Sequence, residues 1–183
     1  MKTSFVFLAD GFEEIEALAT IDVMRRAGMP VVTVSINPTP QVTGAHGVPV
    51  LADALIADCH LADAEWLICP GGMPGATNLA ACRPLTDTLV AQNRAGGKLA
   101  AICASPAIVL APLGIITGRD AVCYPGMEVD CGAKWAATAM VVVDDNVVTG
   151  RGPAAACEFG LTIVRQTLGA DAALQVAKGM LIA

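Results

Sequence analysis

Cys103 is the residue whose surroundings in the sequence most favour chemistry. It follows the apolar segment Leu99–Ile102 and precedes Ser105-Pro106, where a new helix is expected to begin. A cysteine at such a strand-to-helix turn lies at the edge of a sheet, where free backbone N–H groups and the helix dipole favour the thiolate. The alternative is a buried, inert thiol, the commonest state of a free cysteine. Position alone leaves both interpretations open.

Three glutamates, Glu13, Glu14 and Glu16, surround the expected start of the first helix. A carboxyl group beside the thiolate could serve as proton donor and acceptor. Acids at a helix N-terminus also stabilise the helix dipole without any catalytic role. The spacing does not decide which of the three faces Cys103.

Gly71 and Gly72 follow a third apolar segment and could offer backbone N–H groups to a developing oxyanion, or could form a plain turn. No phosphate-binding glycine pattern is present. The two histidines are His46 and His60, so none follows Cys103, and a Cys-His triad is hard to build. The seven cysteines contain no C-x-x-C pair, so we expect neither a metal site nor a cofactor.

The elements that would position these residues alternate along the chain. Continuous apolar runs without alternation are typical of strands buried on both faces of a parallel sheet. Such runs occupy four segments: Ser4–Ala9, Val31–Ile36, Trp66–Cys69 and Leu99–Ile102. A hairpin is expected from two further segments, Thr138–Val143 and Val147–Thr149.

Helical patterns fill the intervals between these strands. Ile15, Leu18, Ala19 and Val23 form an expected buried stripe on the first helix. Further helices are expected over residues 84–95, about 106–111, from 157 to 168, and 172–177. The sequence predicts one α/β domain over residues 1–183, a three-layer sandwich with a mostly parallel sheet and helices on both faces. In such sheets ligands bind at the carboxyl ends of the strands, which is where the candidate residues fall.

Composition limits the classes of partner. The chain has 183 residues, 55% hydrophobic and 15% charged, which excludes a disordered chain. A net charge of −6 argues against nucleic acid or an anionic membrane as the main partner. Unpaired cysteines and early acidic residues favour a cytoplasmic protein without a secretory leader. The uncharged stretch Leu99–Gly118 is interrupted by prolines, so no membrane span is expected.

Five segments together resemble the ThiJ/PfpI superfamily, most closely its DJ-one branch, the parkinsonism-associated deglycase group. They are the segments Ala9–Ala17, Asp22–Gly28, Pro70–Gly75, Ala100–Pro106 and Arg151–Pro153. The resemblance implies a flavodoxin-like sandwich and a homodimer with the first helix at the interface.

The resemblance also implies roles for individual residues. It places the nucleophilic, oxidation-prone cysteine on Cys103 and the partner carboxylic acid on Glu16. It places oxyanion-type backbone donors on Gly72, with Gly71 beside it, and on Ala104. Arg26 matches an arginine that this branch uses at the dimer interface.

Two positions depart from the animal members of the branch. Tyr124, before Pro125, stands where they have a histidine near the site, so we expect Tyr124 to line the substrate site. A tyrosine is a poor base at neutral pH. His46 stands where they have an interface arginine, so dimer contacts are expected to differ.

Two functions follow as expectations. The first is a glutathione-independent glyoxalase or deglycase that uses Cys103 and Glu16 on methylglyoxal-type 2-oxoaldehydes. The alternative is a redox-sensing protein or chaperone of the oxidative-stress response, in which Cys103 is oxidised to a sulfinate. A peptidase or amidotransferase is disfavoured because no histidine follows Cys103.

Overall fold

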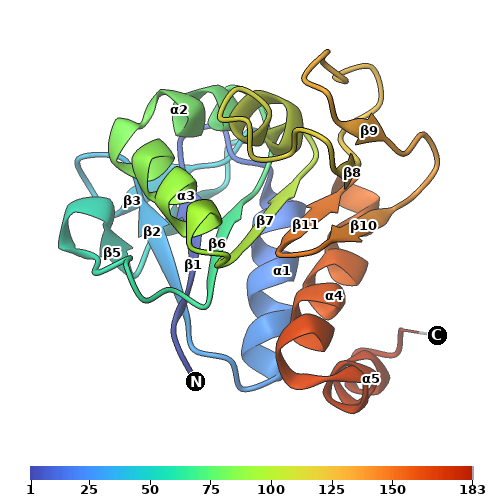
Figure 1. Ribbon diagram of the computed structural model, residues 1–183. Coiled ribbons are helices and arrows are strands. Elements are labelled where there is room, and N and C mark those ends of the chain that lie inside the picture. Colours follow the sequence, from blue (N-terminus) through green and yellow to red (C-terminus); the bar gives the residue numbers. More distant parts are fainter. Residues whose placement is uncertain (183) are drawn as a thin grey trace.

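The computed structural model describes residues 1–182 and is built around a seven-stranded sheet (Figure 1). The strand order is β10-β11-β7-β6-β1-β2-β5. All neighbouring strands are parallel except β10 and β11, which form the predicted hairpin. The bounds are β1 (Ser4–Leu8), β2 (Val31–Ser35), β5 (Ala54–Leu55), β6 (Trp66–Cys69), β7 (Lys98–Ile102), β10 (Val141–Asp144) and β11 (Val147–Gly150).

Helices cover both faces of this sheet. Figure 1 shows α1 (Glu14–Arg26) beside α4 (Ala156–Leu168), followed by α5 (Ala170–Gly179). The opposite face carries α2 (Gly75–Ala81), α3 (Arg83–Arg94) and a π-helical turn, η2 (Pro106–Leu110). A hydrophobic core lies on each face of the sheet, and alternate residues of β1 pack into one or the other. Val6 and Leu8 face α1 and α4, whereas Phe5 and Phe7 face α2 and α3. The predicted three-layer sandwich is confirmed.

The four predicted buried strands are present to within one residue at each end. The Leu99–Gly118 stretch divides as expected into the end of β7 and the turn η2. Among residues 1–182 we find no helix with the length and apolar content to cross a bilayer.

Several short elements were not predicted. Helix α2 contains only one large apolar residue, Leu79, among glycine, alanine, threonine and asparagine, so it shows no stripe. Another of them is a hairpin of β3 (Gln41–Thr43) and β4 (Pro49–Leu51). The region after residue 118 holds the small pair β8 (Asp120–Ala121) and β9 (Lys134–Trp135).

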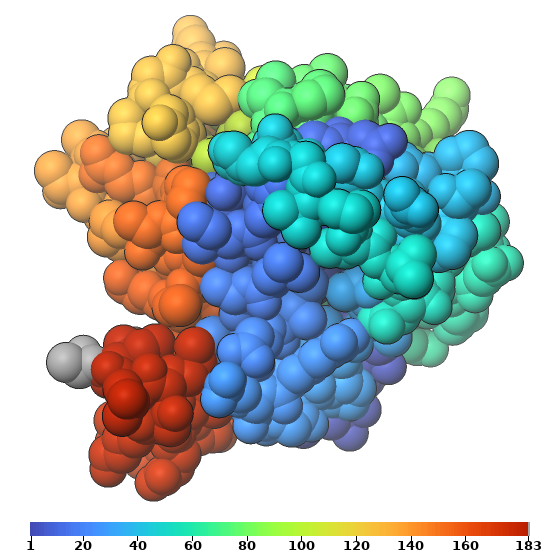
Figure 2. Space-filling model, turned by 180° about the vertical axis from the view of Figure 1, so that it is seen from behind, coloured from blue at the N-terminus to red at the C-terminus, as the bar shows by residue number. Residues whose placement is uncertain are grey.

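The predicted buried stripe on α1 is wrong at two positions. Ile15 is 57% exposed and Leu18 is 42% exposed, whereas Thr20 and Val23 are buried against α4. The orientation follows from Gly160 of α4, where an added Cβ would lie only 2.9 Å from the Val23 Cβ. The close approach of the two helices thus fixes the rotation of α1 and leaves an apolar strip facing outward. Figure 2 shows the α1 segment at the surface, bordered by the β3–β4 hairpin and by α4 and α5.

Candidate active site

Cys103 lies at the turn between β7 and η2, at the carboxyl end of the parallel strands. It is 8% exposed, and its φ of 64° is left-handed, an uncommon conformation for a residue with a side chain. Two neighbours fix this backbone: the Cys103 N–H donates to the Gly150 carbonyl and the Tyr124 N–H donates to the Cys103 carbonyl, both at 2.8 Å. The rim position was predicted, but the strained backbone was not. Strain of about 1–3 kcal/mol at such a residue is common at functional sites.

Glu16 is the glutamate that α1 turns inward toward this rim. Its side chain is fully buried, and Oε2 accepts a 2.8 Å hydrogen bond from the Gly71 N–H. The other oxygen, Oε1, has no hydrogen-bond partner with acceptable geometry among residues 1–182. Glu13 caps the helix, because its Oε2 accepts the Glu16 N–H at 2.8 Å. A second bond, from the Glu13 N–H to the Gly71 carbonyl at 3.0 Å, ties the start of α1 to the loop after β6.

Glycine is required at both positions after Pro70. A Cβ on Gly71 would lie 2.6 Å from the Cys103 Cβ and 2.7 Å from Glu16 Oε2. Gly72 has a φ of +86°, and a Cβ there would lie 2.3 Å from the Glu13 nitrogen. The loop therefore brings two backbone amides into the space between nucleophile and acid without filling it.

Burial sets the ionisation of the acid. Burial raises the pKa of Glu16 to about 7, against the opposing effects of the neighbouring Cys103 thiol and of the Gly71 amide. The charge of Glu13 adds a smaller upward push on the same pKa. Glu16 is thus available both as an acid and as a base near neutral pH.

Burial and the negative charge of Glu16 also raise the pKa of Cys103, while the amides of Gly72 and Ala104 lower it. Burial and the charge of Glu16 outweigh the effect of the two amides. The two groups therefore behave as one coupled pair. When Glu16 holds the proton, its charge no longer opposes the thiolate and its carboxyl can donate to sulfur.

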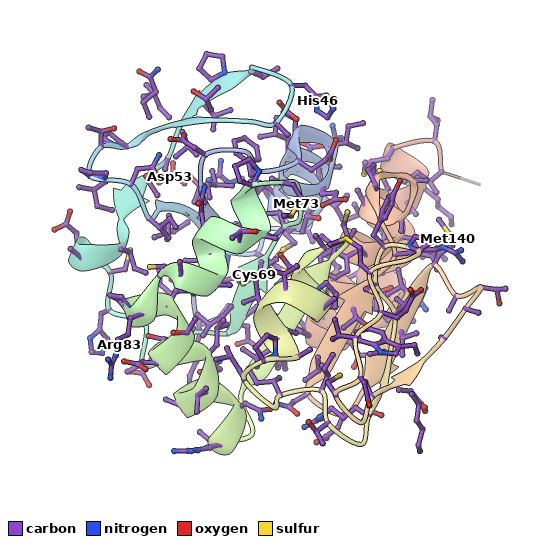
Figure 3. All side chains as sticks on the ribbon, turned by 90° about the horizontal axis from the view of Figure 1, so that it is seen from above. His46, Asp53, Cys69, Met73, Arg83 and Met140 are labelled. Carbon is purple, nitrogen blue, oxygen red and sulfur yellow. The ribbon has the colours of Figure 1, made fainter. Side chains whose placement is uncertain are left out.

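Tyr124 lines an open cavity of about 440 Å³ beside Cys103. The remaining lining residues come from the segment after β8, the segment before β10 and the turn after β11: Pro125, Met140, Arg151, Gly152, Pro153 and Ala154. Met140, labelled in Figure 3, lies on the side of the molecule that carries the hairpin β10–β11. Arg151 was not predicted as a site residue. Its signal in the sequence was its place directly after Gly150, at the carboxyl end of a parallel strand.

A sequence model described as the DJ-1/PfpI family matches residues 2–166. The chain belongs to the DJ-1/PfpI family.

Individual relatives support this assignment to the DJ-1/PfpI family. "Protein DJ-1 homolog B" of Arabidopsis thaliana is 36% identical over 96% of this chain, which spans only 40% of that protein's length. "Glutathione-independent glyoxalase DJR-1.2" of Caenorhabditis elegans is 34% identical, with 100% of this chain and 97% of that protein covered. The solved structure "Toxoplasma gondii DJ-1, oxidized" superposes with a TM-score of 0.93 at 35% identity, covering 100% of both chains. The flavodoxin-like expectation is thereby confirmed together with the DJ-1 branch.

His46 joins the β3–β4 hairpin to the first turn of α1. It lies in the loop of the β3–β4 hairpin, where its backbone N–H donates to Glu14 Oε1 and its Nδ1 lies 2.7 Å from Glu14 Oε2. The hydrogen bond and charge of Glu14 raise the pKa of His46. Glu13, Glu14 and His46 also hold one possible metal-ligand atom each within 4.8 Å of one another. These are the residues of the described chain that could share a cation.

Arg26, the residue placed at the dimer interface by resemblance to the DJ-1 branch, lies at the opposite end of α1 from Glu16. Its Nε is 2.7 Å from Oδ2 of Asp22, an exposed ion pair within the same helix. The intermolecular role of Arg26 stays a prediction.

Proposed function

We propose that this protein is a cysteine-dependent, glutathione-independent glyoxalase that converts 2-oxoaldehydes such as methylglyoxal into 2-hydroxy acids. The proposal rests on the buried carboxyl of Glu16, which lies beside Cys103 and whose pKa burial raises to about 7. A relative that shares 34% identity over the whole of this chain is named for this activity.

The first step would be attack of the Cys103 sulfur on the aldehyde carbon, which forms a hemithioacetal. The amides of Gly72 and Ala104 face the sulfur and lower the pKa of Cys103, so they are placed to stabilise an oxyanion on the attacked carbon. Protonated Glu16 favours the thiolate form of Cys103 and supplies the proton to this oxygen.

The second step would be a proton transfer between the two substrate carbons. Ionised Glu16 removes the proton from the former aldehyde carbon to give an ene-diol and returns it to the neighbouring carbon. The product is a thioester of the 2-hydroxy acid on Cys103, and water releases it as lactate when methylglyoxal is the substrate. The aldehyde carbon is oxidised and the ketone carbon is reduced within the same substrate molecule, so the overall reaction consumes only water. The same attack on sugar-derived adducts would account for deglycase activity.

The test is the amount of lactate formed from methylglyoxal in phosphate buffer without amines or thiols, because those scavenge the substrate. Cys103→Ala should abolish lactate formation, and Glu16→Gln should lower it by about 100-fold or more. Cys157→Ser, which changes a thiol on α4 outside the site, should leave it unchanged. Equal rates for the wild type and Cys103→Ala, or none above buffer, would rule out the proposal.

A second function is favoured by the unpartnered Oε1 of Glu16. Peroxide would oxidise the Cys103 thiolate to a sulfinate, to which protonated Glu16 could donate a short hydrogen bond. One related solved structure is of an oxidised DJ-1. In this second function the site reports oxidative stress.

Intact-mass measurements after mild peroxide test this second function. We expect two added oxygen atoms in the wild type and none in Cys103→Ser. Cys69 and Cys123 are more deeply buried than Cys103, so these thiols should stay reduced. Oxidation of another cysteine before Cys103 would contradict the sensing role.

A further inference from the structure

We propose that the cavity beside Cys103 selects 2-oxoaldehydes whose substituent is a flat apolar ring with an anionic group at its far end. This inference rests on the proposed function, since it names the substrate class of the same nucleophile. It is carried by the size of the cavity, its apolar walls and the single charge within it.

The cavity adjoins the two residues whose backbones form hydrogen bonds with the backbone of Cys103. Tyr124, on one wall, donates its N–H to the Cys103 carbonyl at 2.8 Å. Arg151 and Gly152, on the other wall, follow directly after Gly150, whose carbonyl accepts the Cys103 N–H at 2.8 Å. We infer from this proximity that the substituent of a substrate bonded to Cys103 extends between these two walls.

The cavity is too large for the smallest substrates. Its volume of about 440 Å³ lies in the range of about 300–1,000 Å³ in which proteins bind drug-sized ligands. Methylglyoxal has only a methyl group beyond its two carbonyls, so most of this space would hold water. A ring-sized substituent would bury the apolar surface that methylglyoxal leaves open.

The walls favour a flat apolar group. Tyr124 is half exposed. One edge of its ring lies against the backbone of Gly152, since a Cβ added to Gly152 would lie 3.3 Å from Tyr124 Cδ2. Met140 and Pro153 supply further apolar surface. Tyrosine and methionine both make favourable contacts with aromatic rings.

Arg151 is the only charged residue in the lining. Its backbone N–H donates to the Met140 carbonyl at 2.9 Å, but its guanidinium makes no ion pair or hydrogen bond with any group of residues 1–182. A guanidinium presents a planar fork of donors that matches a carboxylate or a phosphate. Because the whole chain has a net charge of −6, attraction for an anion at this place must come from Arg151 itself.

The experiment measures binding of ketones that cannot form a product, in the Cys103→Ala protein. The probes are acetophenone, 4-acetylbenzoate and 4-acetylphenyl phosphate, which separate the neutral ring, the carboxylate and the phosphate. We expect at least one anionic probe to bind about tenfold or more tightly than acetophenone. Adding Arg151→Met should remove this preference, and Arg151→Lys should retain part of it.

Arg83→Met is the matched control, because Arg83 is exposed on α3 and does not line the cavity. It should leave the preference unchanged. Equal affinity for all three probes, a preference that survives Arg151→Met, or no binding of any probe would each overturn the inference. Since the probes are not turned over, a negative lactate assay combined with an Arg151-dependent preference would reject the glyoxalase activity and keep the anion-selective cavity.

Discussion

The Gly71 N–H donates to Glu16 Oε2 across 2.8 Å, and the missing side chain of Gly71 leaves the space in which Glu16 and Cys103 meet. One residue thus supplies both a hydrogen bond to the acid and the room for the nucleophile. It also joins the end of β6 to the first turn of α1 through its carbonyl, which accepts the Glu13 N–H. The site is therefore sensitive to small changes in this loop.

Gly71→Ala should damage the site more than the fold. Its Cβ would overlap both the Cys103 Cβ and Glu16 Oε2, so the two side chains must separate. Overpacking of this kind costs typically about 1–3 kcal/mol, which thermal unfolding would detect. Lactate formation should fall by about tenfold or more, because even a small displacement of a reacting group from its productive position slows the reaction.

Gly179→Ala is the control for that substitution, since nothing lies within 4 Å of a Cβ at the end of α5. It should be neutral or slightly stabilising. If Gly71→Ala kept full activity, the close approach of Cys103 and Glu16 would not matter for turnover.

Glu16→Gln should stabilise the protein at alkaline pH while it inactivates it. Burial raises the pKa of Glu16 from 4.5 to about 7, so between these values the folded state holds a proton that the unfolded state has lost. The favourable effect is complete below pH 4.5 and is lost as the pH rises to about 7, a change of about 3 kcal/mol in the free energy of unfolding. A neutral glutamine removes this dependence.

Denaturant unfolding of both proteins across this pH range is the measurement. Wild type should lose stability relative to Glu16→Gln as the pH rises, and the exposed control Glu158→Gln should follow the wild type. Parallel curves for wild type and Glu16→Gln would contradict a raised pKa for Glu16.

His46→Ala should weaken the attachment of the β3–β4 hairpin to α1 in a narrow pH window. Glu14 raises the pKa of His46 above 6.5, so the contribution of the protonated ring is complete below pH 6.5 and is lost as the pH rises through the raised value. The hydrogen bond with His46 lowers the pKa of Glu14 below 4.5 despite its burial, so the contribution of its carboxylate is complete above pH 4.5 and is lost as the pH falls through the lowered value. The difference in Tm between wild type and His46→Ala should therefore be largest in mildly acidic solution.

By about pH 9 that difference should be smaller, because neutral His46 no longer carries the charge. His60→Ala is the control, since His60 is exposed and lies 3.9 Å from the nearest oxygen of Asp63. A difference that stays constant from acid to alkaline pH would mean that His46 acts through packing alone.

We propose that the outward strip of α1 forms the interface of a homodimer, as the family resemblance implies. Ile15 and Leu18 are exposed apolar residues on adjacent turns of a helix whose other face is buried. Leu18→Lys should shift the protein from dimer to monomer in light scattering after size-exclusion chromatography. Leu174→Lys changes an exposed leucine on α5 and should leave the dimer intact. A monomeric wild type would reject this interface.

The sheet was predictable because short continuous apolar runs, bounded by glycine or proline, are typical of strands buried on both faces between helices. Cys103 could be placed at the rim from the same pattern. The selection of Glu16 could not come from periodicity, because the rotation of α1 depends on Gly160, far away in the sequence. Resemblance to a family supplied that choice, and the structure brings Glu16 to Cys103. The apolar strip of Ile15 and Leu18 misled the prediction because apolar spacing alone does not show which surface a residue covers.

The cavity beside Cys103 was beyond the sequence argument for a similar reason. Its walls come from three segments with no shared pattern, around Tyr124, Met140 and Arg151. Only the parallel pairing of β11 with β7 brings Arg151 to the same rim as Cys103.

The bond between Tyr124 and Cys103 uses backbone atoms only. Any residue except proline at position 124 can make it, so the identity of that side chain is independent of the conformation that holds the nucleophile. Evolution can exchange the aromatic wall for another residue and retune which aldehydes are accepted, while the reactive centre keeps its geometry. This separation gives the scaffold a position at which specificity can diverge without a loss of chemistry.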